Sequence, residues 1–173
     1  LAGQYGAVIR YQGGNNAGHT VINDMGKFAL NLLPSGIFRK GTLNLLGAGT
    51  VINPEHLTGE IEKVRERGVA VTPENLKISD RAVMVLPIHP AQDQWEEKRL
   101  GAKHFGSTQR GISPAYGDRA MKKCLRMGDL LHPGALEAQL RLLVDWKNQV
   151  FIPGYGQPPI SYEETLDWVR RWG

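Results

Sequence analysis

The sequence is poor in cysteine and in long apolar runs. Cys124 is the only cysteine among 173 residues, so the chain cannot form an internal disulfide. Such a composition is typical of a reducing compartment, and we expect a cytoplasmic protein in which Cys124 is a small buried residue on a helix. No apolar stretch approaches the roughly 20 residues of a membrane-spanning helix, and no secretory signal pattern occurs. We therefore expect no membrane contact.

Charge of one sign is also scarce. The net charge is +4, and the basic residues are scattered along the chain. A nucleic-acid-binding protein usually concentrates its basic residues in one stripe, so we expect no nucleic-acid partner. A small cluster consists of Arg119, Lys122, Lys123 and Arg126. It is either a solvated helix face or a surface that attracts an anionic substrate such as a nucleotide.

Alternating strand and helix patterns are present. Buried strands are predicted at 7–11, 42–46, 76–78 and 83–86, and a hairpin is predicted to turn at Asn23–Gly26. Helices are predicted after Asn53-Pro54, over 91–100 and 115–125, after Pro133 and after the capping box at Ser161. This order favours an α/β fold with a mostly parallel central sheet and flanking helices.

A loop rich in glycine and amides, residues 10–20, follows the first predicted strand. Gly13, Gly14 and Gly18 allow backbone N–H groups to approach an anion closely. Asn15 and Asn16 tolerate tight turns and can donate hydrogen bonds, and His19 can carry a proton near neutral pH. This composition favours phosphate binding. A lone histidine is more often structural, and His56, His89, His104 and His132 share no metal-ligand spacing.

This loop and several later segments resemble the adenylosuccinate synthetase family. The similar segments are 10–20, 27–37, 46–54, 78–82, 89–93, 105–116 and 125–131. Two long signatures in register are far more specific than one glycine motif. The resemblance implies a P-loop-like sheet, only part of which is present, so residues 1–173 are expected to be a partial domain for IMP binding and dimerisation.

The family reaction joins L-aspartate to IMP with GTP as co-substrate, through a 6-phosphoryl-IMP intermediate. The resemblance implies that His19 is the catalytic histidine and that the Gly18 carbonyl ligates Mg²⁺. Gly13, Gly14 and Arg110 would belong to the phosphate loops. Asn16 and Thr108 match contacts to the IMP phosphate, and a flexible Gly111 would let the second loop respond to substrate.

Lys122 stands where the family uses an arginine that reaches the neighbouring subunit's IMP. The resemblance therefore implies a homodimer. Lysine keeps the charge and loses the planar fork of arginine, and Ser113 replaces a usual glycine nearby. Both departures indicate a divergent member of the family.

Two parts of the family pattern have no match in this chain. One is the preceding segment, which carries the family's catalytic aspartate, and the other is the set of C-terminal signatures. The resemblance covers roughly the N-terminal two-fifths of a family member. Three interpretations stay open: part of an IMP-specific ligase, part of a relative that adds aspartate to another purine nucleotide such as dGMP, or a fragment that binds nucleotide phosphate or dimerises without catalysis.

Overall fold

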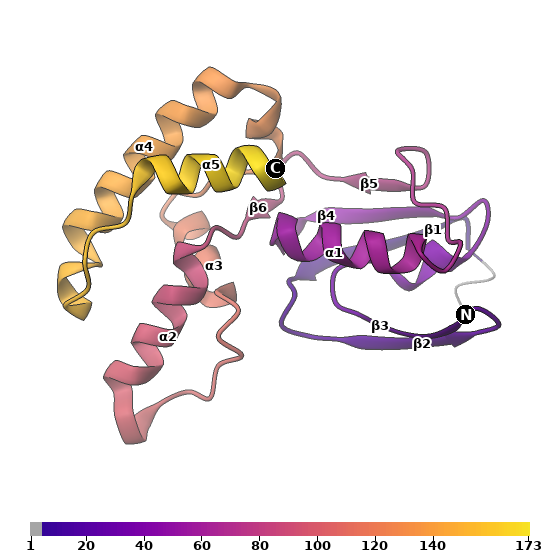
Figure 1. Cartoon of the computed structure of the whole chain (residues 1–173), viewed down its shortest axis with the longest axis horizontal. Helices are drawn as coiled ribbons and strands as arrows, with labels where there is room; N and C mark the ends of the chain where they lie inside the picture. The colour runs from indigo at the N-terminus through magenta and orange to yellow at the C-terminus, as the bar shows by residue number, and fades with distance from the viewer. Residues whose placement is uncertain (1–4) are drawn as a thin grey trace.

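Two lobes make up the molecule in the computed structural model, which describes residues 5–173 (Figure 1). The strands and the first helix form one lobe, and the remaining helices form the other. A short strand, β6 (Val83–Met84), lies at the junction. Helix α5 also joins the lobes, because Trp168 Nε1 donates to Glu55 Oε2 on α1 at 3.2 Å.

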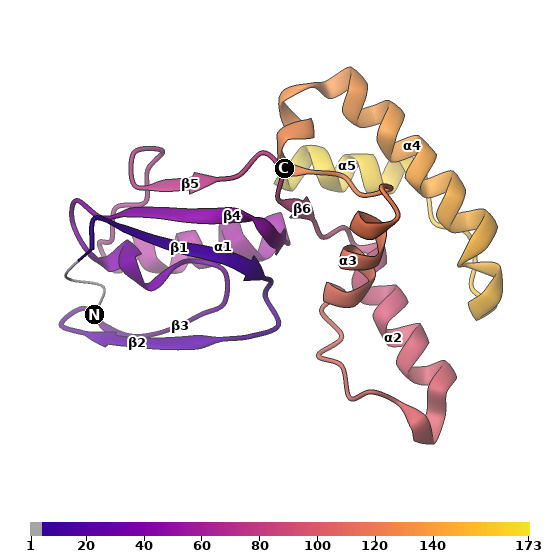
Figure 2. The ribbon, with the colours of Figure 1, turned by 180° about the vertical axis from the view of Figure 1, so that it is seen from behind.

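The strand lobe is built on a parallel sheet in the order β1-β4-β5, with β6 paired to the far end of β4. The strands are β1 (Ala7–Gly13), β4 (Leu43–Ile52) and β5 (Leu76–Ile78). Helix α1 (Pro54–Arg65) covers one face of this sheet, and Figure 2 shows β1 and β4 in front of it. Strand β1 is an edge strand, and Ile9 and Tyr11 on it are 56% and 68% exposed.

A separate antiparallel hairpin, β2 (His19–Asn23) and β3 (Gly26–Leu30), packs beside the sheet. Its turn is the predicted one. Phe28 and Leu30 point into the core between hairpin and sheet, together with Leu32 and Leu33. The pairing of His19 with Leu30 places the end of the glycine-rich loop directly beside the end of β3.

The helical lobe holds four helices around its own core. They are α2 (Ile88–Leu100), α3 (Ile112–Ala120), α4 (Pro133–Val150) and α5 (Tyr162–Trp172). Short 3₁₀ segments connect the elements at Ser35–Phe38, Gly101–Lys103, Met127–Leu131 and Pro153–Tyr155. Leu140 and Leu143 of α4 are almost fully buried, which fixes this helix against the rest of the lobe.

Two helix starts follow the predicted capping chemistry. Asn53 Oδ1 accepts a hydrogen bond from the His56 backbone N–H at 3.0 Å, and Pro54 opens α1. Ser161 Oγ accepts from the Glu164 N–H at 3.2 Å at the start of α5. None of the helices within residues 5–173 is long and apolar enough to cross a bilayer.

Several predicted boundaries were wrong. Strand β1 runs to Gly13, β6 ends at Met84, and α2 begins at Ile88, three residues before the predicted start. Strand β4 runs to Ile52, because Gly47 and Gly49 let its backbone pass close to Tyr11 of β1 rather than ending the strand. Helix α3 begins at Ile112 and ends at Ala120, so Cys124 is buried after the helix and not on it. The helix begins three residues before the predicted start at 115, and Gly111 is its N-cap residue.

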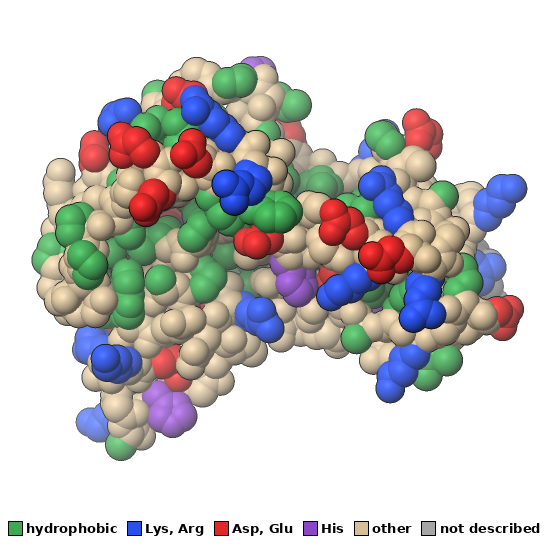
Figure 3. All heavy atoms as spheres, viewed as in Figure 1, with side chains coloured by type: hydrophobic (Ala, Val, Ile, Leu, Met, Phe, Trp, Pro, Cys, Tyr) green, Lys and Arg blue, Asp and Glu red, His purple; other side chains and the backbone are tan. Residues whose placement is uncertain are grey.

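Charged side chains of both signs are mixed over the surface. On the face shown in Figure 3, Lys and Arg side chains are interspersed with acids on both lobes and form no single stripe. Apolar side chains gather on the helical lobe in this view.

Candidate functional site

The loop that follows β1 is shaped by two glycines with different roles. Gly13 has φ +85°, a left-handed conformation that favours glycine. At Gly14 a Cβ atom would lie 2.6 Å from Ile112 Cδ1 and 2.9 Å from the Val51 carbonyl oxygen. Only a residue without a side chain therefore allows the loop to pack between β4 and the start of α3.

Tyr116 fastens the same loop to α3. The Gly13 backbone N–H donates to the Tyr116 hydroxyl at 2.9 Å, and that hydroxyl donates to the Gly49 carbonyl at 2.7 Å. One side chain thus connects β1, β4 and α3. The two segments that the sequence singled out, 10–20 and 105–116, are brought together here.

The remaining loop residues differ in how far they are exposed. Asn16 is exposed in the turn, and Gly18 is exposed next to Asn31, whose Nδ2 lies 3.2 Å from the position of a Cβ on Gly18. His19 opens β2 and is partly buried. Its Nε2 is buried without a hydrogen-bond partner among the described residues, so the imidazole retains an unused polar atom beside the loop.

The environment of His19 favours its neutral form. Burial lowers the pKa of His19, and the Arg10 guanidinium lowers it further, while Glu60 and a hydrogen bond to the Leu33 backbone oppose both effects. A neutral imidazole can donate through one nitrogen and accept through the other. It can therefore donate a hydrogen bond to a phosphoryl oxygen or accept a proton.

Glu60 holds the backbone that follows β3. The side chain is 5% exposed, and its carboxylate accepts hydrogen bonds from the backbone N–H groups of Asn31 (2.6 Å), Leu32 (3.0 Å) and Leu33 (2.9 Å). His56 Nε2 lies 3.0 Å from Glu60 Oε1. Burial alone would raise the pKa of Glu60, but its contacts with His56, Leu33 and Asn31 lower it overall, so the group is a carboxylate at neutral pH.

The loop that carries Thr108 and Arg110 is fixed at both ends by carboxylates of α2. The Phe105 and Gly106 N–H groups donate to Glu97 at 3.1 and 2.9 Å, and the Gly111 N–H donates to Asp93 Oδ2 at 3.0 Å. Thr108 and Arg110 are exposed at the tip of the loop.

The expectation that Gly111 keeps this loop flexible was wrong. Gly111 is buried with φ +74°, and a Cβ there would lie 2.5 Å from the backbone of His89 and Pro90. It is a close-packing position that anchors the loop.

Lys122 lies at the opposite end of α3 from the loop. It has φ +59° and follows the C-cap Met121, with the Lys123 N–H donating to the Asp118 carbonyl at 2.8 Å. These features form a helix-ending motif in which glycine is the usual left-handed residue. The structure thus does not bring Lys122 together with Asn16, His19 and Thr108.

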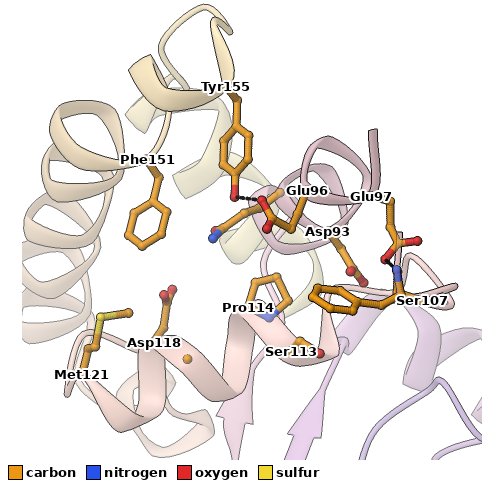
Figure 4. A pocket seen from close by; sticks show the side chains of 13 residues that line it. Asp93, Glu96, Glu97, Ser107, Ser113, Pro114, Asp118, Met121, Phe151 and Tyr155 are labelled. Carbon is orange, nitrogen blue, oxygen red and sulfur yellow. Dashed lines mark hydrogen bonds between the residues drawn. The ribbon is translucent and has the colours of Figure 1, made fainter. Parts of the chain in front are cut away.

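A cavity of about 380 Å³ lies between α2, α3 and the 3₁₀ segment after α4 (Figure 4). Four carboxylates line it, but each has partners: Asp118 accepts from Lys147 at 2.7 Å and pairs with His89 at 2.9 Å, and Glu96 accepts from the Tyr155 hydroxyl at 3.1 Å. Asp93 and Glu97 hold the Thr108 loop. The carboxylates that line the cavity are therefore used to hold the surrounding structure, and none of them is left without a partner to bind a ligand.

The described residues do not build a magnesium site on their own. Within residues 5–173 no three His, Cys, Asp or Glu side chains are grouped as metal ligands. The Gly18 carbonyl would be a single oxygen ligand, and a hard cation needs about six.

Three residues of this site escaped prediction. Tyr116 lies 103 residues from Gly13 and Glu60 lies 27–29 residues from the backbone that it holds, so no local pattern indicated either contact. Arg10 was part of the quoted loop but was assigned no role. A charged residue within the apolar strand pattern was the available signal.

Comparison with known proteins gives matches along the whole chain. The family model for adenylosuccinate synthetase matches residues 1–173. Adenylosuccinate synthetase 2 of Pseudoalteromonas translucida is 46% identical over 172 residues, and the alignment covers 99% of this chain and 40% of that protein. The enzyme of Dehalococcoides mccartyi strain BAV1 is 43% identical over 173 residues, again with 40% of its length covered.

Solved structures agree. The fully ligated adenylosuccinate synthetase of Plasmodium falciparum superposes with a TM-score of 0.84 at 29% identity, covering 99% of this chain and 39% of that one. Succinoaminodeoxyadenylate synthetase of cyanophage S-2L, bound to dGMP and dATP, gives a TM-score of 0.56 at 24% identity over 84% of this chain, a likeness of fold alone. The chain spans about two fifths of the length of the curated relatives that it matches.

Proposed function

The chain belongs to the adenylosuccinate synthetase family, and we propose that it forms the part of a ligase that holds the IMP phosphate and the transferred phosphoryl group. The proposed reaction is the GTP-dependent ligation of L-aspartate to IMP in purine biosynthesis. GTP phosphorylates the 6-oxygen of IMP, and the aspartate amine then displaces the phosphate.

One observation supports this proposal most strongly. The Tyr116 hydroxyl bonds to both Gly13 and Gly49, so the end of the second family segment contacts the first segment directly. The first supplies Gly13, Gly14, Asn16 and His19, and the second supplies Thr108 and Arg110 at its tip.

Each side chain then has a role that suits its place. His19 donates a hydrogen bond to the moving phosphoryl group, and its Nε2, which is buried without a partner among residues 5–173, is the atom available for it. Exposed Asn16 and Thr108 bind the 5′-phosphate of IMP, and exposed Arg110 adds positive charge on the loop that carries Thr108. Bound Mg²⁺ would neutralise phosphate charge, with Gly18 as at most one of its ligands.

We propose a homodimer in which Lys122 reaches the neighbouring site. Its place at the far end of α3, away from His19 and Thr108, supports action on another subunit rather than on its own. Sedimentation equilibrium of the protein with and without IMP tests the dimer, and a mass that stays monomeric in both would contradict it.

Replacement of His19 by Asn tests the catalytic proposal in the protein that carries this chain. Adenylosuccinate formation from IMP, GTP, Mg²⁺ and aspartate should fall by about 10²–10⁴-fold, while the Kd for IMP changes little. The matched control is His132→Asn, which alters an exposed histidine in the helical lobe. Near-normal turnover in His19→Asn would remove the catalytic role.

The same assay with dGMP in place of IMP tests the second candidate substrate. We retain dGMP as a candidate substrate because Lys122 and Ser113 depart from the usual family residues. Turnover with dGMP and not with IMP would assign the chain to a relative that modifies another purine. Turnover with neither, in a protein that still binds IMP, would mean nucleotide binding without catalysis.

A further inference from the structure

Arg10 is a partly buried cation without a matching anion. It lies on β1 beneath the glycine-rich loop, and its Nη2 donates to the Gly14 carbonyl at 2.8 Å. Its Nε is buried without a hydrogen-bond partner among residues 5–173. No carboxylate of those residues lies within ion-pair distance of it. A guanidinium has five N–H donors, and burial of such a charge is costly unless a partner is present.

The carboxylate whose charge acts on Arg10, Glu60, already has other partners. The Glu60 carboxylate accepts from three backbone N–H groups and pairs with His56, so it acts on Arg10 only through its field. Two further buried atoms around the same loop lack partners in the described part of the chain, His19 Nε2 and Asn15 Oδ1. Buried polar atoms are nearly always hydrogen-bonded, and three of the four unpartnered atoms surround this one loop.

We propose that Arg10 is an anion-binding residue that receives a phosphate oxygen of the bound nucleotide on the inner side of the Gly13–His19 loop. The planar guanidinium can bond the Gly14 carbonyl through one arm while Nε and the other arm face the anion. Arg10 thereby holds the loop and the ligand together. This inference rests on the proposed function only in naming the ligand a nucleotide.

Inorganic phosphate is the first probe, titrated into the purified ¹⁵N-labelled chain while amide chemical shifts are followed. Saturable shifts at residues 13–19 are expected. Arg10→Gln should raise the Kd for phosphate about tenfold or more, since a charge-assisted hydrogen bond is lost. Lys40→Gln is the matched control, because it removes the same charge from an exposed site of the same lobe and should change the Kd less than about twofold.

Arg10→Lys guards against a folding defect. It keeps the charge and loses the fork, so it should still fold and should weaken phosphate binding by an intermediate factor. Unchanged phosphate affinity in a folded Arg10→Gln variant overturns the proposal. If Arg10→Gln does not fold, a phosphate affinity of Arg10→Lys equal to that of the wild type overturns the proposal instead. Absence of saturable shifts in the wild-type chain also overturns it.

Parallel titrations with IMP and with GTP identify the source of the phosphate. Weaker binding of IMP alone assigns the 5′-phosphate, and weaker binding of GTP alone assigns the triphosphate. If the protein binds phosphate through Arg10 but forms no adenylosuccinate, the proposed function is contradicted and this inference still holds.

Discussion

At the scale of single residues, Lys122 shows a conflict between helix stability and charge. A side chain in the left-handed region costs about 1–2 kcal/mol relative to an unstrained backbone, and glycine removes that cost. Lys122 therefore places a cation where the backbone favours glycine. Strained positions of this kind are more frequent at functional sites.

We expect Lys122→Gly to raise the stability of the protein and to weaken IMP binding. The gain of up to about 1 kcal/mol corresponds to a Tm increase of about 2–4 °C for a chain of this size. Lys122→Arg should leave Tm unchanged and tighten IMP, because arginine restores the bidentate fork. Differential scanning calorimetry measures the Tm of each variant, and calorimetric titration measures its Kd for IMP. Equal IMP affinity in all three proteins would mean that the phosphate is held elsewhere.

Glu60 makes the stability of the strand lobe depend on pH. Its folded pKa lies below the ordinary value of about 4.3. The stabilisation is therefore complete above that value and is lost as the pH falls through the lower folded pKa. Glu60→Gln should be less stable than wild type at neutral pH, and the difference should shrink as the pH falls below about 4.3.

Urea unfolding at a series of pH values measures this effect. Glu62→Gln, an exposed change on the same helix, should follow the wild-type curve. A Glu60→Gln curve parallel to wild type at every pH would show that the carboxylate charge does not hold residues 31–33.

At the scale of elements, the site depends on how α3 is docked. Tyr116→Phe keeps the ring and removes the hydroxyl that bonds Gly13 and Gly49. Two backbone groups then lose their partner, so we expect a loss of about 1–3 kcal/mol in the free energy of unfolding. The loop of residues 13–19 should also become more mobile and bind IMP less tightly.

Chemical denaturation and amide hydrogen exchange at Gly13 test this prediction. Tyr5→Phe alters a tyrosine that is 62% exposed and should be silent. If exchange at Gly13 were the same in Tyr116→Phe and in wild type, the connection between α3 and the loop would not depend on the hydroxyl.

Local chemistry made some elements predictable and others not. The β2–β3 hairpin followed from turn residues between alternating segments, and α1 followed from Asn53 and Pro54, since these signals act over a few residues. The length of β4 and the start of α3 did not follow, because glycines 47, 49 and 111 serve close backbone approach to distant segments. The loop composition and the family signatures indicated the candidate site, whereas Tyr116 and Glu60 became visible only through contacts across the fold.

At the scale of the whole molecule, the chain corresponds to a limited part of the length of its family relatives. It matches about two fifths of its curated relatives, and its edge strand β1 exposes Ile9 and Tyr11. The two lobes are joined through Tyr116, β6 and Trp168, which connects the two segments of the proposed phosphate site.

The proposed function requires that residues 13–19 and 107–111 form one phosphate-binding site. Titration of the ¹⁵N-labelled chain with IMP, followed by amide chemical shifts, measures whether they do. Amide signals of both segments should shift together and give the same Kd, and the signals of α5 should stay in place. Shifts in one segment without the other, or in neither, would contradict it.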